Sequence, residues 1–89
     1  MIIDKKKNKI AFEDVETEDI VVELREYLAE VGGEIVKFDF TNCEDLHTAV
    51  VQVIGSYKLI YDVDFQFSEE KSAYKMALEG FSLCEDNFN

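Results

Sequence analysis

The chain has 89 residues, a length that suits one domain with a single hydrophobic core. Asp and Glu number 20 against 9 Lys and Arg, so the formal net charge is −11 at pH 7. A surface this acidic repels phosphate groups, which argues against binding to nucleic acid or to anionic membranes. The same charge favours attraction to a basic protein, although it also serves solubility alone.

Two further observations bear on location and chemistry. No apolar run approaches the ~20 residues that span a bilayer, and the N-terminus lacks the apolar stretch of a signal peptide. We therefore expect a cytoplasmic protein without membrane insertion. The two cysteines, Cys43 and Cys84, match no metal or redox spacing, so we expect two buried free thiols and no cofactor.

The chain begins with a predicted pair of strands. Residues 1–13 read as a short strand, a lysine-rich turn and a second strand, in which Ile10 and Phe12 point to one side. The turn carries much of the positive charge of the chain, and a solvated loop explains it better than a binding patch does.

A helix is predicted over residues 17–31. Thr17 can cap it, and the acids that follow favour the positive end of the helix dipole. Gly32 and Gly33 then supply a stop that tolerates a left-handed residue. The apolar stripe of this helix comprises Ile20, Leu24, Tyr27, Leu28 and Val31.

A strand over residues 34–41 and a second helix from Asp45 to Tyr57 come next. Apolar and polar residues alternate along the strand, and Asp45 is a plausible helix cap. The alternating apolar residues of the strand are Val36, Phe38 and Phe40. The predicted buried stripe of the helix comprises Leu46, Ala49, Val50, Val53, Ile54 and Tyr57.

The last predicted elements are a strand over residues 59–67 and a third helix that follows the cap residue Ser68. Residues 83–89 are expected to form a tail. The residues of the strand that face the core are Leu59, Tyr61, Val63, Phe65 and Phe67. The core stripe of the third helix comprises Tyr74, Ala77, Leu78 and Phe81.

The expected fold is therefore α/β in the order β-β-α-β-α-β-α, with a mostly parallel four-stranded sheet. A parallel sheet covered on both faces shows continuous apolar runs, whereas strands 34–41 and 59–67 alternate. We therefore expect the helices to pack mainly on one face and to leave the other face open and acidic. That open face is expected to carry Lys37, Asp39, Asp62 and Asp64.

Several segments carry a resemblance to a known family. Glu13-Asp14-Val15 leads into an acidic helix start, and the strand 36–40 leads through a short loop into the second helix. Residues 55–58 resemble the end of that family's second helix, and residues 74–81 resemble its last helix. Together they resemble the STAS domain, the module of bacterial anti-sigma-factor antagonists. The resemblance implies one STAS-like domain over residues 1–89 that is a regulator acting by protein–protein interaction.

The resemblance also implies partners and a switch. STAS domains dock on kinase-like anti-sigma factors, and others serve as transporter subunits on the cytoplasmic side. In the family, a serine at the start of the second helix is phosphorylated, which breaks the contact with the partner. This chain has Asp45-Leu46-His47-Thr48-Ala49 there, so Thr48 is the candidate phosphorylation site. A phosphate of about −2 charge there would face existing acids.

The predicted partner-binding surface lies at the start of the second helix, where Val51 is expected to form a small exposed apolar spot. Its residues are Glu44, Asp45, His47, Thr48, Val51 and Gln52. No catalytic residues are expected, because His47 has neither oxyanion donors nor a glycine loop beside it. Asp39, Asp62 and Asp64 offer too few converging oxygens for a metal site.

One alternative of another class remains open. The chain could be an acidic inhibitor, such as an immunity protein that blocks a basic nuclease toxin, and this explains the net charge better. The dependence of the association rate on salt distinguishes the two hypotheses, because a charge-steered association slows sharply at high ionic strength.

Overall fold

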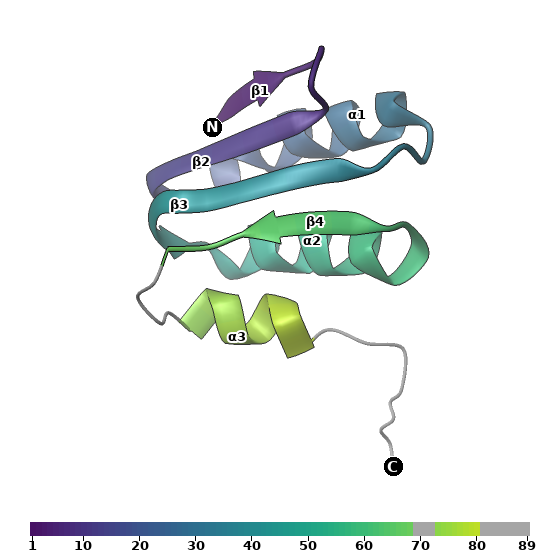
Figure 1. Cartoon of the computed structure of the whole chain (residues 1–89). Helices are drawn as coiled ribbons and strands as arrows, with labels where there is room; N and C mark the ends of the chain where they lie inside the picture. Colours follow the sequence, from purple (N-terminus) through teal and green to yellow (C-terminus); the bar gives the residue numbers. More distant parts are fainter. Residues whose placement is uncertain (69–72, 81–89) are drawn as a thin grey trace.

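The computed structural model describes residues 1–68 and 73–80, which form one sheet with helices packed against it (Figure 1). The strands are β1 (Ile2–Asp4), β2 (Lys9–Glu16), β3 (Val36–Leu46) and β4 (Val63–Gln66). The described helices are α1 (Val21–Val31), α2 (Thr48–Ile60) and α3 (Ala73–Gly80), with a short 3-10 turn, η1 (Glu18–Ile20), before α1.

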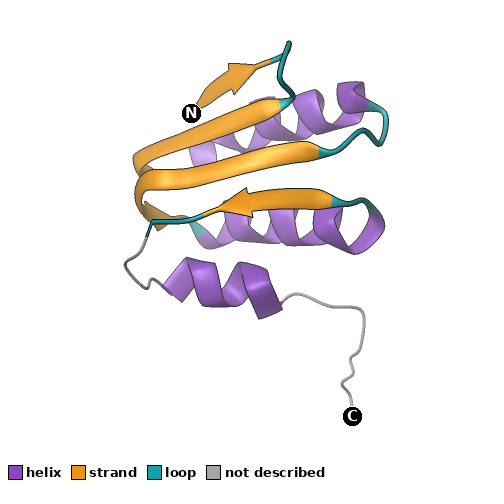
Figure 2. Ribbon diagram, viewed as in Figure 1, coloured by secondary structure: helices purple, strands orange, loops and turns teal. Residues whose placement is uncertain are grey.

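The sheet has the strand order β1-β2-β3-β4. β1 pairs antiparallel with β2, whereas the β2–β3 and β3–β4 pairs are parallel. The predicted α/β class with a mostly parallel, four-stranded sheet is therefore confirmed. Figure 2 shows α1 and α2 behind this sheet, and α3 beyond the β4 edge, where it contacts α2. None of the helices in the described part of the chain combines the length and the apolar character needed to cross a bilayer.

The centre of the core is a set of phenylalanine rings on the helix-facing side of the sheet. Phe12, Phe38 and Phe40 are buried, as the alternation in the sequence predicts. The Phe12 and Phe40 rings stack with centroids 4.8 Å apart and an interplanar angle of 11°. Burial of a side chain of this size stabilises the fold by roughly 1.5–3 kcal/mol.

The first helix begins and ends close to the predicted residues. The Thr17 hydroxyl accepts a hydrogen bond from the Asp19 N–H at 3.4 Å, so Thr17 caps the chain where η1 begins. The chain first forms this 3-10 turn and becomes α-helical at Val21. Gly32 ends α1 in the left-handed conformation with φ of 69°, which a glycine adopts without steric cost.

The boundary between β3 and α2 differs from the prediction. β3 continues to Leu46 instead of ending at residue 41, because β2 is long enough to pair with it as far as Glu16↔Leu46. Register shifts accompany this pairing, and Asp14 has φ of 48° within the irregular part. Asp45 therefore lies in a strand and does not cap the helix, and Leu46 is buried as a strand residue.

The end of α2 differs as well. The helix runs on to Ile60, and the Tyr61 N–H still donates to the Tyr57 carbonyl, so the predicted strand 59–67 begins only at Val63. Tyr61 was expected to face the core from that strand, but it is 41% exposed beside the helix end. An apolar run such as Leu59-Ile60 suits a helix and a strand equally, and here the helix continues through it.

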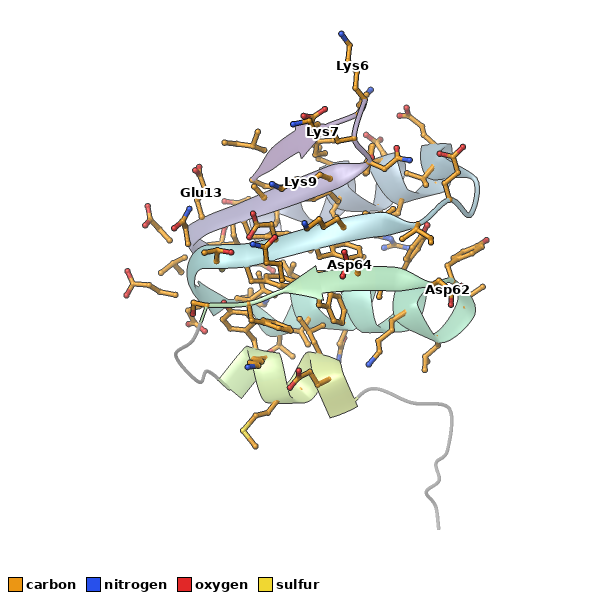
Figure 3. The ribbon with its side chains drawn as sticks, in the orientation of Figure 1. Lys6, Lys7, Lys9, Glu13, Asp62 and Asp64 are labelled. Atoms are coloured by element: carbon orange, nitrogen blue, oxygen red, sulfur yellow. The ribbon has the colours of Figure 1, made fainter. Side chains whose placement is uncertain are left out.

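The open face of the sheet carries both charges instead of being acidic. The strand register places Asp4, Lys9, Lys37 and Asp64 in one row across the four strands. The Lys9 Nζ lies 3.4 Å from a carboxylate oxygen of Asp39 in the next row. Figure 3 shows Lys9 and Asp64 on the sheet, with Asp62 ahead of β4 at the end near α2. Both charges therefore share this face, and Lys9 and Asp39 form an ion pair on it.

Polar contacts of Tyr74 and Lys58 attach α3 to the rest of the fold. The Tyr74 hydroxyl donates to the Cys43 carbonyl in β3. The Lys58 ammonium, on α2, donates to the Leu78 carbonyl at 2.8 Å and the Glu79 carbonyl at 3.2 Å. These carbonyls belong to the last described turn of α3, where a lysine ammonium also interacts favourably with the helix dipole. Ser68 is described, whereas Phe81, Cys84 and the predicted tail lie outside the described residues.

Replacing Lys58 tests this attachment. We expect Lys58→Met to keep the aliphatic packing but to lower the free energy of unfolding by about 1–2 kcal/mol, because two carbonyls lose a charged donor. Urea denaturation measures the loss, and amide hydrogen exchange should speed up mainly in α3. Lys6→Met, on an exposed turn residue, is the control. Equal stabilities of the two variants would show that the carbonyl contacts contribute nothing.

Candidate functional site

The predicted binding residues at the start of α2 divide between a strand and a helix. Glu44 and Asp45 are exposed in the last part of β3, and Thr48 is the exposed first residue of α2. His47 lies between them and is also exposed. These four side chains occupy one continuous stretch of surface where β3 leads into α2.

His47 caps the helix. Its Nδ1 accepts a hydrogen bond from the Ala49 N–H at 3.0 Å, and its carbonyl accepts from the N–H groups of Val50 and Val51. Its own N–H donates to the Glu16 carbonyl of β2 at 3.0 Å, which ties the helix start to the sheet. These contacts give His47 a structural role at the position predicted for Asp45, although histidine is not among the usual capping residues.

Val51 does not belong to an exposed binding surface, which corrects the sequence prediction. It is only 7% exposed. Val51, Gly55 and Lys58 recur at helical spacing on one flank of α2, and Lys58 of that flank contacts α3. Val51 is therefore part of the core cluster, which the periodicity of α2 alone does not reveal.

Gln52 points to the opposite flank, where α1 and α2 enclose an open groove of about 570 Å³. Ala49 and Val53 were predicted to lie in the buried stripe of α2, but they are only half-buried and line this groove. The pattern that could have indicated the groove is the presence of small residues, Ala49 and Ser56, on this flank of the helix. The residues that line the groove from α1 and the turn after it are Val21, Arg25, Leu28, Ala29, Gly32 and Gly33. Those from α2 and its end are Ala49, Gln52, Val53, Ser56, Tyr57, Ile60 and Tyr61.

The groove owes its width to small residues on both helices. Ala29 and Gly32 on one side face Ala49 and Ser56 on the other, so no large side chain fills the space. At one end, the Tyr61 ring closes over Gly33, where an added Cβ would lie 3.2 Å from the ring and φ is 92°. Both constraints favour glycine at position 33.

The lining is apolar with few polar groups. Arg25 is the only charged residue of the lining and the only arginine of the chain. Ile60 is 74% exposed at the rim. The Tyr57 hydroxyl is buried and has no hydrogen-bond partner within residues 1–68 and 73–80. Burial, followed by the neighbouring Tyr61 and Tyr27, raises the pKa of Tyr57, so its hydroxyl stays neutral and available as a donor.

The remaining candidate residues have structural partners. Burial raises the pKa of the Cys43 thiol, whose Sγ donates to the Asp45 carbonyl at 3.2 Å. Burial also opposes ionisation of Asp39, but hydrogen bonds from Thr41 and Lys9 outweigh it and lower the pKa of this carboxyl. Within the described ranges, no three His, Cys, Asp or Glu side chains cluster as metal ligands would.

Comparison with protein-family models, with curated proteins and with solved structures finds no match to this chain. The STAS resemblance stays a prediction, and the groove is the feature from which a function can be argued.

The capping role of His47 can be measured. We expect His47→Ala to lower the free energy of unfolding by about 1 kcal/mol, because the Ala49 N–H loses its acceptor. His47→Asn should retain most of the stability, since asparagine is a good capping residue. Thermal or urea denaturation distinguishes the two. If His47→Asn is as unstable as His47→Ala, the ring rather than the cap stabilises this turn.

The buried thiol makes a prediction about pH. In a Cys84→Ser background, Cys43 is the single thiol, and its raised pKa leaves less thiolate at any given pH than in the unfolded chain. The pH at which maleimide labelling accelerates should therefore be higher in the native protein than in urea. Labelling curves that coincide in the two conditions would contradict the burial of this thiol.

Proposed function

We propose that the chain is a protein-interaction domain that docks a partner through the outer surface of α2. The contact begins at Thr48 and continues past Gln52 into the groove with α1. The observation that supports this proposal is the groove between the two helices, which is open, mainly apolar and has a volume of about 570 Å³. Apolar concave surfaces with a few polar groups are typical binding sites.

Regulation by phosphorylation fits into this proposal. Thr48 is exposed at the first position of α2, where a phosphate is compatible with the helix dipole. The same phosphate would add negative charge beside Glu44 and Asp45 at the edge of the docking surface. A kinase-like anti-sigma factor or a transporter subunit, the partners of STAS domains, would then be released by repulsion and not by unfolding.

The net charge supports a second candidate. The chain has a formal charge of −11, and Glu23, Glu26 and Glu30 are exposed along α1 next to the groove. These acids favour a basic partner, as an inhibitor of a basic toxin would have. In that case association should slow steeply with added salt, whereas docking through the apolar groove should change much less.

Site-specific cross-linking tests the docking surface. A photoreactive amino acid at Gln52 should capture the partner in the native cell, and the same residue at Asp64 on the open sheet face should not. We further expect Thr48→Glu to reduce capture from position 52 several-fold, because it places a negative charge at the contact while suiting the helix start.

Two outcomes oppose the proposal. Capture from Asp64 and not from Gln52 would place the interface on the open face of the sheet. Unchanged capture with Thr48→Glu would remove phosphorylation at this residue from the proposal and leave the groove as the docking site.

A further inference from the structure

We infer that the groove receives an amphipathic helix of the partner, which brings one carboxylate to Arg25 from within its apolar face. The inference rests on the proposed function and deepens it, because it names what docks and which residue recognises it. It also makes Arg25 the residue that determines specificity, a role that the start of α2 does not supply.

The dimensions of the groove fit a helix. Its wall on α2 runs from Ala49 to Ile60, roughly 16 Å at about 1.5 Å per residue, which matches about three turns of a partner helix. Packed helices lie about 8–10 Å apart, and small side chains at the contact allow the closer approach. Ala29 on α1, Gly32 at its C-cap and Ala49 on α2 are such residues, so the apolar side chains of a third helix can lie between them.

The polar groups of the lining select the chemistry of the occupant. Arg25 is exposed, and no ion pair or hydrogen bond of its guanidinium occurs within residues 1–68 and 73–80. Arg25 is the one charged residue of an otherwise uncharged lining. Its guanidinium is suited to a carboxylate, which it can bind through two parallel N–H···O bonds. The apolar surroundings strengthen that attraction once the occupant excludes water.

Tyr57 contributes apolar ring surface to the wall of the groove, because its hydroxyl is buried out of reach of an occupant. The selection of a charged group therefore rests on Arg25. A second copy of this chain is a poorer occupant, because the contact would join two molecules that each carry a charge of −11.

The test uses a display library of 16-residue helical peptides, with leucines fixed at helical spacing along one face and all other positions randomised. Selection on the full chain should enrich Asp or Glu at one position adjoining the leucines. Replacing that acid with its amide should weaken binding about tenfold, the effect of losing one charged hydrogen-bonded pair. The net charge of the chain alone would have the opposite effect: the amide peptide is less negative, so the acidic chain would repel it less and bind it more tightly.

Matched variants of the protein locate the effect. In Arg25→Gln, the difference between the acid and amide peptides should vanish, whereas Arg25→Lys should retain part of it. Lys37→Gln removes one positive charge from the open sheet face and should leave the difference unchanged. Circular dichroism checks that each variant is folded, and amide chemical shifts in α1 and α2 should follow the bound peptide.

Several results would overturn the inference. These are selected peptides without a shared acid, equal affinities for the wild type and Arg25→Gln, and shifts confined to the open sheet face. Self-association that Arg25→Gln abolishes would also overturn it, by making a second copy the occupant. If no peptide is enriched but position 52 still captures a partner in cells, the inference fails while the docking function stands.

Discussion

The stacked phenylalanine rings on one face of the sheet are the constraint on which the other elements depend. Phe12 comes from β2, and Phe38 and Phe40 come from β3, so these rings fix the two central strands to each other. The Tyr57 ring meets Phe38 edge-on at 6.4 Å, which positions α2. The Tyr74 ring lies 5.5 Å from Phe40, which positions α3. Loss of Phe38 would therefore loosen α2, and loss of Phe40 would loosen α3.

This arrangement gives α2 three different surroundings. One side of the helix packs on the rings, and the flank with Val51 and Lys58 faces α3. The flank with Ala49, Gln52 and Ser56 faces α1 across the groove, where small side chains leave the space open. The open flank is thus a consequence of how both neighbours are placed, and the size of its residues keeps it from closing.

Sequence patterns predicted the parts of the fold that depend on local physics. Alternation identified Phe38 and Phe40 as core residues, Thr17 marked the start of the 3-10 turn that leads into the first helix, and Gly32 marked the end of that helix. The strand after Phe40 was missed because its buried residues, Phe40, Cys43 and Leu46, lie three apart through the irregular register and so break the alternation. The cap at His47 was missed because Asp45 is the commoner capping residue.

The candidate site was harder to predict, because it depends on tertiary placement. Val51 looks exposed on an isolated helix, but in the fold it is buried as part of the core cluster. Arg25 looks like one of many charged residues on α1, and its significance appears only when Gln52 and Ser56 of α2 lie opposite it. Spacing within one helix cannot show which of its flanks meets another helix and which meets a groove.

The groove and the core share a residue, which links binding to stability. Tyr57 packs against Phe38 on the sheet side, and it lines the groove on the other. An occupant that covers the Tyr57 ring and Ile60 would bind only the folded chain, so it would stabilise the fold by mass action. In a domain of this size the apolar area that folding can bury is limited. The apolar surface that stays exposed at Ile60 and Tyr61 adds nothing to the stability of the free chain. The proposed docking would therefore add apolar burial that folding alone leaves incomplete.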